Sequence, residues 1–431
     1  MAETNTAAQR RGWYYGWNII AVLILAQLAG NGLTYNAFSL FVKGWHEDLH
    51  ARISDLMLCI TAMVLVSAPL SPIVGAMADK YPAKWIFGIG LVGMGAFYLL
   101  ASFATEAWQL VALFAAVAGP MLALSASIPA NAVIARWFVR RLGFAMGLGA
   151  FGIGAGGVLI PPLVGLLLPD FGWRAIWRFG GLFVIFIVMP LVVAVVRDRP
   201  TEREGLHYVT IDEVGPTAVV HGHGAPASGQ GPTMREVLMR RNFWLLVIIY
   251  LCIMGSGFAF NQNLAPIAAK HGLRPETAGL LIAVSSAAHV LANLVLGLAA
   301  DRYGSRVPLV ALAISVGVGA ALIGLGGGTL GLVIGAALIG ANAAVFTPVA
   351  IALAAEFGPS GVGKAFGMIM FFVPIATSTG FILARSEEAT GSYAAAAAGF
   401  VAVVVLAVLL CFALRPPRGP AQSEQLEPSL G

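Results

Sequence analysis

Two copies of one short pattern decide the fold: Gly75-Ala-Met-Ala-Asp79-Lys80-Tyr81 and Gly297-Leu-Ala-Ala-Asp301-Arg302-Tyr303-Gly304-Ser305-Arg306. Each copy follows an apolar run that is long enough to cross a membrane, and the second copy comes about half a chain length after the first. A second repeated pattern, Ala145-Met-Gly147 and Ala365-Phe-Gly367, has its two copies separated by nearly the same number of residues as the first. Matching patterns at matching places indicate an internal duplication.

Composition points to the same kind of protein. The chain has 431 residues, of which 59% are hydrophobic and 10% are charged, whereas a soluble domain carries about 25% charged residues. A membrane-spanning helix needs about 20 apolar residues. Runs of this kind lie at 17–42, 56–78, 85–105, 107–135, 142–169, 179–196, 242–269, 277–300, 307–326, 328–355, 365–384 and 389–414, the ninth and tenth divided at the glycines 326–328. The sequence therefore predicts an all-α membrane protein with twelve transmembrane helices in two six-helix halves.

The polar intervals predict the domain organisation. We expect an N-terminal six-helix half at 1–196, a cytoplasmic linker at 197–241, a C-terminal six-helix half at 242–414 and a disordered cytoplasmic tail at 415–431. Most of the 25 Lys and Arg residues fall on alternate loops that include both chain ends. Cytoplasmic loops attract positive charge, so we expect both termini in the cytoplasm and the protein in the inner (plasma) membrane of a bacterial cell.

The same topology explains the net charge of +5, so no nucleic-acid partner is predicted. The cysteines Cys59, Cys252 and Cys411 lie apart in apolar runs and form no metal-binding spacing. We expect no metal, no cofactor and no ATP coupling. An enzyme in the membrane would need paired catalytic groups at membrane depth, and the carboxylates all lie near helix ends, which argues against an enzyme.

The repeated loop pattern resembles the inner-loop signature of the major facilitator superfamily, G-x-x-x-D-[RK]-x-G-[RK]-[RK]. The second copy matches it well, and the first departs from it at Pro82. The resemblance implies a secondary transporter that works by alternating access, with a gating motif in which Gly lets two helix ends approach and Asp pairs with Arg at the cytoplasmic face. In this chain the gating motif consists of Gly75, Asp79, Lys80, Gly297, Asp301, Arg302 and Arg306. The alternative interpretation of the repeated pattern is that it only determines membrane topology and helix packing.

A narrower resemblance is to the monocarboxylate and oxalate/formate transporter branch. It rests on Arg136-Trp137-Phe138, on Arg140-Arg141-Leu-Gly143-Phe-Ala145-Met-Gly147 and on Gly172-Trp173-Arg174. This branch implies a small organic acid as substrate, moved by proton symport or anion exchange. Many members of the branch carry Arg where this chain has Asn293, so the usual residue that binds a carboxylate is missing. A larger or uncharged substrate therefore remains an alternative.

Polar side chains in membrane-spanning helices are costly, so they are the first candidates for the transport path. We expect a cavity lined by the first and seventh helices. His289 is the ionisable residue nearest a helix middle and shares a face with Asn293; it is the candidate for proton coupling. The alternative for every one of these residues is a hydrogen bond between helices. The candidate substrate-binding residues are Asn31, Tyr35, Asn36, Ser125, Asn261, Asn263, His289, Asn293, Asn342 and Thr377.

The fifth helix contains two glycine patterns. Gly147-Leu-Gly149-Ala-Phe-Gly152 matches G-x-G-x-x-G, but it follows no strand, so we interpret it as a helix-packing surface. The stretch from Gly157 to Gly165 is similar to the antiporter signature of the superfamily except at Pro161. The remaining alternatives are therefore a drug or metabolite efflux antiporter and a transporter-like sensor. The expected partners are the lipid bilayer and a small molecule, most readily an organic anion; the oligomeric state is not predicted.

Overall fold

The computed structural model describes residues 14–125, 130, 133–134, 137–138, 142–197, 233–357 and 359–414. Within these ranges every regular element is a helix. Most of the expected linker and the whole expected tail lie outside the described residues.

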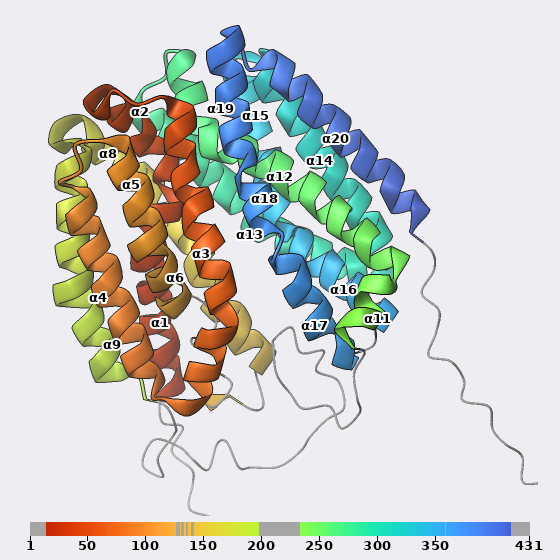
Figure 1. The fold of residues 1–431 in the computed structure, drawn as a ribbon, viewed down its shortest axis with the longest axis horizontal. Coiled ribbons are helices and arrows are strands. Elements are labelled where there is room, and N and C mark those ends of the chain that lie inside the picture. The colour runs from red at the N-terminus through yellow and green to blue at the C-terminus, as the bar shows by residue number, and fades with distance from the viewer. Residues whose placement is uncertain are drawn as a thin grey trace, which may run out of the picture.

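The N-terminal helices form one bundle, on the left in Figure 1. Eleven described runs are long and apolar enough to span a membrane, and the longest, Gly154–Val195, has 42 residues. That run is divided at Gly172, whose φ of 69° and ψ of 165° are not helical, so it holds two spans. The elements are α1 (Gly16–Asn31), η1 (Gly32–Asn36), α2 (Phe38–Leu49), α3 (Ile53–Lys80), α4 (Ala83–Ala101), α5 (Ala107–Leu113), η2 (Phe114–Ala118), α6 (Gly119–Ser125), α8 (Leu142–Phe183), η3 (Val184–Val188) and α9 (Met189–Val195).

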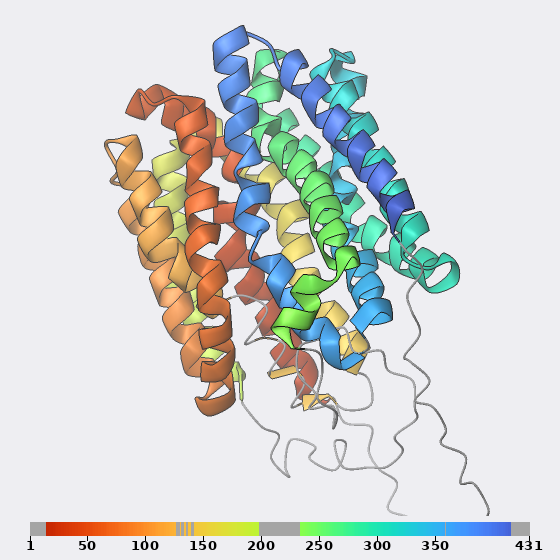
Figure 2. The same cartoon turned by 45° about the vertical axis from the view of Figure 1, so that its right-hand side comes forward.

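The C-terminal helices form a second bundle beside the first (Figures 1 and 2). Gly326 and Gly328 have φ of 87° and 63°, and these two left-handed residues separate the ninth helix from the tenth. The elements are α11 (Met234–Met239), α12 (Arg241–Lys270), α13 (Pro275–Tyr303), α14 (Arg306–Gly324), α15 (Gly328–Gly340), η5 (Ala341–Val345), α16 (Phe346–Phe357), α17 (Pro359–Met370), α18 (Val373–Thr377), α19 (Thr379–Thr390) and α20 (Ala394–Ala413). The predicted fold class, twelve helices in two halves, is confirmed.

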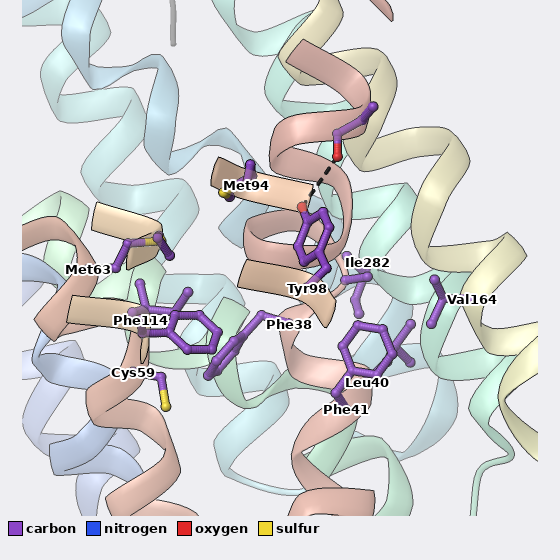
Figure 3. Close-up of a cluster of buried hydrophobic side chains, with 14 of the residues drawn as sticks. Phe38, Leu40, Phe41, Cys59, Met63, Met94, Tyr98, Phe114, Val164 and Ile282 are labelled. Carbon is purple, nitrogen blue, oxygen red and sulfur yellow. Dashed lines mark hydrogen bonds between the residues drawn. The ribbon is translucent and has the colours of Figure 1, made fainter. Parts of the chain in front are cut away.

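A cluster of buried aromatic rings forms the core of the N-terminal half. Trp177 packs against the rings of Trp45 and Tyr98, each with centroids 5.4 Å away, and Phe97 packs against Phe114 at 4.9 Å. All of these side chains are buried, and several of them appear in Figure 3. Edge-to-face pairs of this kind add stability beyond the area that they bury.

The first transmembrane helix widens into a π-turn at η1, where the N–H of Ala37 bonds the carbonyl of Gly32 at 2.9 Å. Such a turn disturbs the regular ladder, and a neighbour replaces the missing bond. The Tyr98 hydroxyl of α4 donates to the Gly30 carbonyl at 2.8 Å and accepts from the Thr34 hydroxyl at 2.8 Å, the dashed line in Figure 3. Tyr98 therefore holds the turn that carries two site candidates.

The two halves touch at the end where α3 begins and α19 ends, the upper end in Figure 1. The carboxylate of Glu388 accepts from the N–H and from the hydroxyl of Ser54, both at 2.8 Å. It thus caps the first turn of α3 from the opposite half. Nearby, the N–H of Ala265 donates to the Ser39 hydroxyl at 2.8 Å.

Glycines bring α8 and α13 together backbone to backbone across the same boundary. A Cβ atom added to Gly279 would lie 2.4 Å from the Pro161 carbonyl oxygen, and one added to Gly165 would lie 2.6 Å from the Pro275 carbonyl oxygen. On the other side of α8, a Cβ at Gly152 would lie 2.9 Å from Ile24 Cα of α1. The glycine patterns of the fifth helix therefore serve close helix packing.

Removal of the Tyr98 hydroxyl should loosen the π-turn. Tyr98→Phe leaves the Gly30 carbonyl and the Thr34 hydroxyl without their partner in an apolar site, which costs about 1–3 kcal/mol. Hydrogen exchange of the purified protein should show faster exchange at the backbone amides of residues 32–37. Tyr250→Phe is the control, because its buried hydroxyl has no partner among the described residues. Equal protection of these amides in both variants would contradict the role of Tyr98.

Removal of the Glu388 charge should weaken the contact between the halves. Glu388→Gln replaces two charge-assisted hydrogen bonds, each worth about 1.5–3 kcal/mol, with weaker ones. A cysteine at Ala265, which is buried in this contact, should then react faster with a maleimide. The control is Glu387→Gln, because Glu387 pairs with Lys270 of its own half at 2.6 Å. Equal labelling rates in the two variants would show that the cap does not hold the halves together.

Candidate functional site

Tyr35 reaches from the π-turn of the first helix to the seventh helix. Its ring meets the ring of Phe258 edge to face, with centroids 6.0 Å apart. Tyr35 is half-buried, and Phe258 lies near the middle of α12. The structure thus brings together the two helices that were expected to line the transport path, and π-turns inside α-helices are frequent at functional sites.

Asn36, the next residue of the π-turn, and a residue of the other half both lie against Gly157 of α8. A Cβ atom at Gly157 would lie 3.5 Å from Asn36 Oδ1 and 2.3 Å from Ser286 Oγ. Ser286 belongs to α13 and was not among the predicted site residues. The signal that could have found it is its position three residues before His289, which places both on one face of an apolar helix.

His289 lies in the middle of α13 and is half-buried. The amide of Asn293 donates to the backbone carbonyl of His289 at 3.2 Å, not to its ring. The next residue, Val290, packs on α8, since a Cβ at Gly154 would lie 2.7 Å from its Cγ2. His289 therefore lies on a turn of α13 that packs on the other half, and its imidazole has no hydrogen-bond partner in the part of the chain that the structure describes.

Five further predicted residues are hydrogen-bonded to protein carbonyls, and two of them, Asn263 and Asn342, bond another helix, which is the alternative interpretation given above. Asn263 bonds Ala259 and Gly380 at 2.8 and 3.0 Å and so ties α12 to α19. Asn342 lies in the 3₁₀ turn η5 and reaches the Met254 carbonyl at 3.5 Å. Asn31, Ser125 and Thr377 bond carbonyls of their own helices. A substrate contact by any of these five stays a prediction.

Other polar atoms on α12 are left without partners. The hydroxyls of Tyr250 and Ser256 and both amide atoms of Gln262 are buried and unpaired among the described residues. Buried polar atoms are normally hydrogen-bonded, so these three side chains are open to a water molecule or to a ligand. Asn261 is half-buried beside them in sequence. Tyr250 was not predicted, and its only signal was a hydroxyl in a run that otherwise has few polar groups.

The gating motif is described only in part. The side chains of Asp79 and Asp301 are not among those that the structure describes, so the expected pairing of Asp with Arg stays a prediction. Lys80 and Arg302 lie over the rings of Tyr81 and Tyr303, and Arg306 donates to the Leu414 carbonyl. A Cβ at Gly297 would meet the Thr347 side chain at 4.0 Å, and the approach of two helix ends that the motif implies stays a prediction.

Comparison with known proteins identifies the family. The family model "Major Facilitator Superfamily" matches residues 23–267 and 246–429. Human monocarboxylate transporter 11 is 26% identical over 89% of this chain and 79% of its own length. The uncharacterized transporter ESBP6 of Saccharomyces cerevisiae is 27% identical over 67% of this chain, a match that spans only 42% of the yeast protein. The riboflavin transporter RibJ of Trypanosoma brucei brucei is 30% identical over 41% of this chain and 33% of its own length.

Solved structures show the same fold at low identity. A bacterial homologue of the human lysosomal transporter Spinster, in an inward-facing and unoccupied conformation, superposes with a TM-score of 0.72 at 15% identity and covers 93% of this chain and 97% of its own. A point mutant of the nucleoside transporter NupG gives 0.69 at 13% identity and covers 93% and 99%. With the twelve-helix fold and the family match over nearly the whole chain, this protein belongs to the Major Facilitator Superfamily and is a multi-pass membrane transporter.

Proposed function

We propose that the protein is a secondary carrier of a small organic acid, with His289 as the residue that meets the negative charge. The observation that carries this proposal is the position of the His289 ring, half-buried and unpaired in the described part of the chain at the middle of α13. Support also comes from the similarity to monocarboxylate transporter 11, which extends over most of both chains.

The chemistry follows from the cost of charge at membrane depth. A carboxylate cannot cross the hydrocarbon region without a compensating charge. The apolar runs hold no Lys or Arg near their middles, so a protonated imidazole is the available cation. Imidazole changes charge near neutral pH, so the acid and one proton would move together. In the alternative transport mode, the His289 ring would bind one organic anion on each side of the membrane in turn, and the carrier would exchange the two anions.

Alternating access is supported by the way the halves meet. They touch at the upper end through Ser54 and Glu388 and through the glycines of α8 and α13, while α11, α16 and α17 at the lower end pack mainly within their own half. From the positive-inside rule we infer that the upper end lies outside the cell, with both termini in the cytoplasm and the protein in the inner (plasma) membrane. In that orientation this state is closed to the outside, and transport requires the upper contacts to break.

A second candidate function is the transport of a larger uncharged aromatic metabolite. The aromatic pair of Tyr35 and Phe258, together with the unpaired hydroxyls and amide of α12, suits a planar molecule with several hydrogen-bonding groups. The relative RibJ, a riboflavin transporter, is in accord with this candidate. For a substrate without charge, His289 would donate or accept a hydrogen bond and need not change charge.

Uptake into liposomes separates these functions. We expect purified protein to accumulate one acid from a panel of formate, lactate, pyruvate, oxalate and benzoate when an inward proton gradient is imposed. His289→Ala should lower this uptake at least about tenfold, because an uncompensated charge at membrane depth costs well above about 1.4 kcal/mol. The matched control is His271→Ala, which removes an exposed histidine at the end of α12.

Each result of the uptake experiment favours one of the two candidate functions or removes His289 from the mechanism. Uptake of an acid that the gradient drives and that fails in His289→Ala but not in His271→Ala supports the carrier of organic acids. Uptake of riboflavin, with no response to the gradient, would favour the second candidate. Acid uptake that both variants preserve would remove His289 from the mechanism.

A further inference from the structure

A short helix stands immediately before the seventh transmembrane helix, at the lower end of the molecule (Figures 1 and 2). This helix, α11, has a complete capping box. The Thr233 hydroxyl accepts from the N–H of Glu236 at 3.3 Å, and the Glu236 carboxylate accepts from the N–H of Thr233 at 3.0 Å. Val237 on its inner face is fully buried in the core of the C-terminal half. The first turn of the helix and one of its faces are thus fixed.

The depth of α11 follows from Trp244, three residues into α12. The indole N–H of Trp244 donates to the Leu238 carbonyl at 2.8 Å, and the residue is 41% exposed. A half-exposed indole at the end of a membrane helix lies at the level of the lipid headgroups. Because the indole is bonded to the α11 backbone, α11 lies at the same level.

The free face of α11 is both apolar and basic. Met239 and Met234 are 73% and 62% exposed, and Leu238 is 41% exposed. Arg235, Arg240 and Arg241 are exposed too, and no ion pair joins them to another described residue. Apolar side chains beside arginines are typical of helices that lie in the plane of a membrane surface.

The nearby carboxylates do not neutralise these arginines by direct pairing. A pocket of about 370 Å³ beside α11 is lined by Glu236, Met239, Arg240, Glu356 and Phe357. Glu236 is engaged in the capping box, and Glu356 accepts from the amide of Asn242 at 2.7 Å. Arg240 lines this pocket, and no ion pair joins its guanidinium to another described residue. A guanidinium can bind a phosphate with two parallel N–H groups.

We propose that α11 and the first residue of α12 form a binding surface for an anionic phospholipid of the adjoining leaflet. Arg235, Arg240 and Arg241 bind the headgroup phosphate, and Met234, Leu238 and Met239 lie among the upper carbons of the acyl chains. The occupant is a lipid because the surface combines positive charge with exposed apolar side chains at the depth of the headgroups. This inference needs only the membrane location and does not depend on the transported substrate.

Lipid at this surface would act on the moving half of the carrier. α11 packs on α12 and on α17, the lower part of the eleventh helix. A headgroup held by the three arginines would fix the lower ends of both helices relative to the membrane surface. Anionic lipid would then influence the rate at which the C-terminal half moves.

The test is native mass spectrometry of the full chain with lipids added singly. Wild-type protein should retain phosphatidylglycerol in preference to phosphatidylcholine and to phosphatidylethanolamine, which has the same phosphate but a compensating ammonium. Arg235→Gln/Arg240→Gln/Arg241→Gln should reduce retained phosphatidylglycerol at least about tenfold, since each basic residue at an anionic surface contributes about fivefold. The matched control, Lys43→Gln/Arg52→Gln/Arg274→Gln, removes the same charge from exposed positions at the upper end.

A second variant separates the contribution of the apolar side chains from that of the arginines. Met234→Ser/Met239→Ser retains the arginines and should lower retention of phosphatidylglycerol less than the arginine variant does. Equal retention of the three lipids by the wild type, or an equal loss in the arginine variant and its upper-end control, would overturn the proposal. Unchanged retention in the arginine variant would show that the lipid is held elsewhere on the protein, which would also overturn the proposal.

Discussion

Every peptide group inside a bilayer must find its hydrogen-bond partner within the protein. Regular helices meet this constraint without help, and each interruption requires a side chain or a local turn that takes over the lost bond. The first helix shows the principle most clearly. It opens at η1, and the hydroxyl of Tyr98, held among buried aromatic rings, bonds the Gly30 carbonyl. The aromatic core of the N-terminal half therefore fixes the direction in which Tyr35 and Asn36 point.

The same constraint divides the polar residues of the membrane region into two groups. Asn31, Asn263, Asn342, Ser125 and Thr377 bond carbonyls of the protein and so contribute to helix structure. His289, Ser256, Gln262 and Tyr250 have no such partner among the described residues. Residues of the second group belong to α12 and α13, helices of the C-terminal half. The first group contributes to the architecture, and the second includes His289, the residue on which the proposed function rests.

The sequence was sufficient for the architecture because its signals are periodic and local. Twelve apolar runs and the repeated loop pattern predicted the fold class, and Gly172 and the glycines 326–328 end helices through their own backbone preferences. The site was predicted only in outline. Tyr98, Ser286 and Tyr250 gain their importance from neighbours on other helices, and no pattern along one helix reveals such a contact. The approach of two helix ends expected at Gly297 stays a prediction, because it depends on how the halves are placed in each state.

The backbone contact of α8 with α13 has a consequence for leakage. Gly279 and Gly165 allow the backbones of the two helices to touch at the proline carbonyls of the facing helix, so no space for a water molecule is left between the backbones at these two positions. Water needs a polar cavity about as large as itself, and protons travel along files of water. A carrier that exploits an ion gradient loses energy whenever such a file connects the two sides. If this protein is driven by an ion gradient, as we propose, these glycines would limit the leak of ions along α8 and α13 while the carrier is closed at this end.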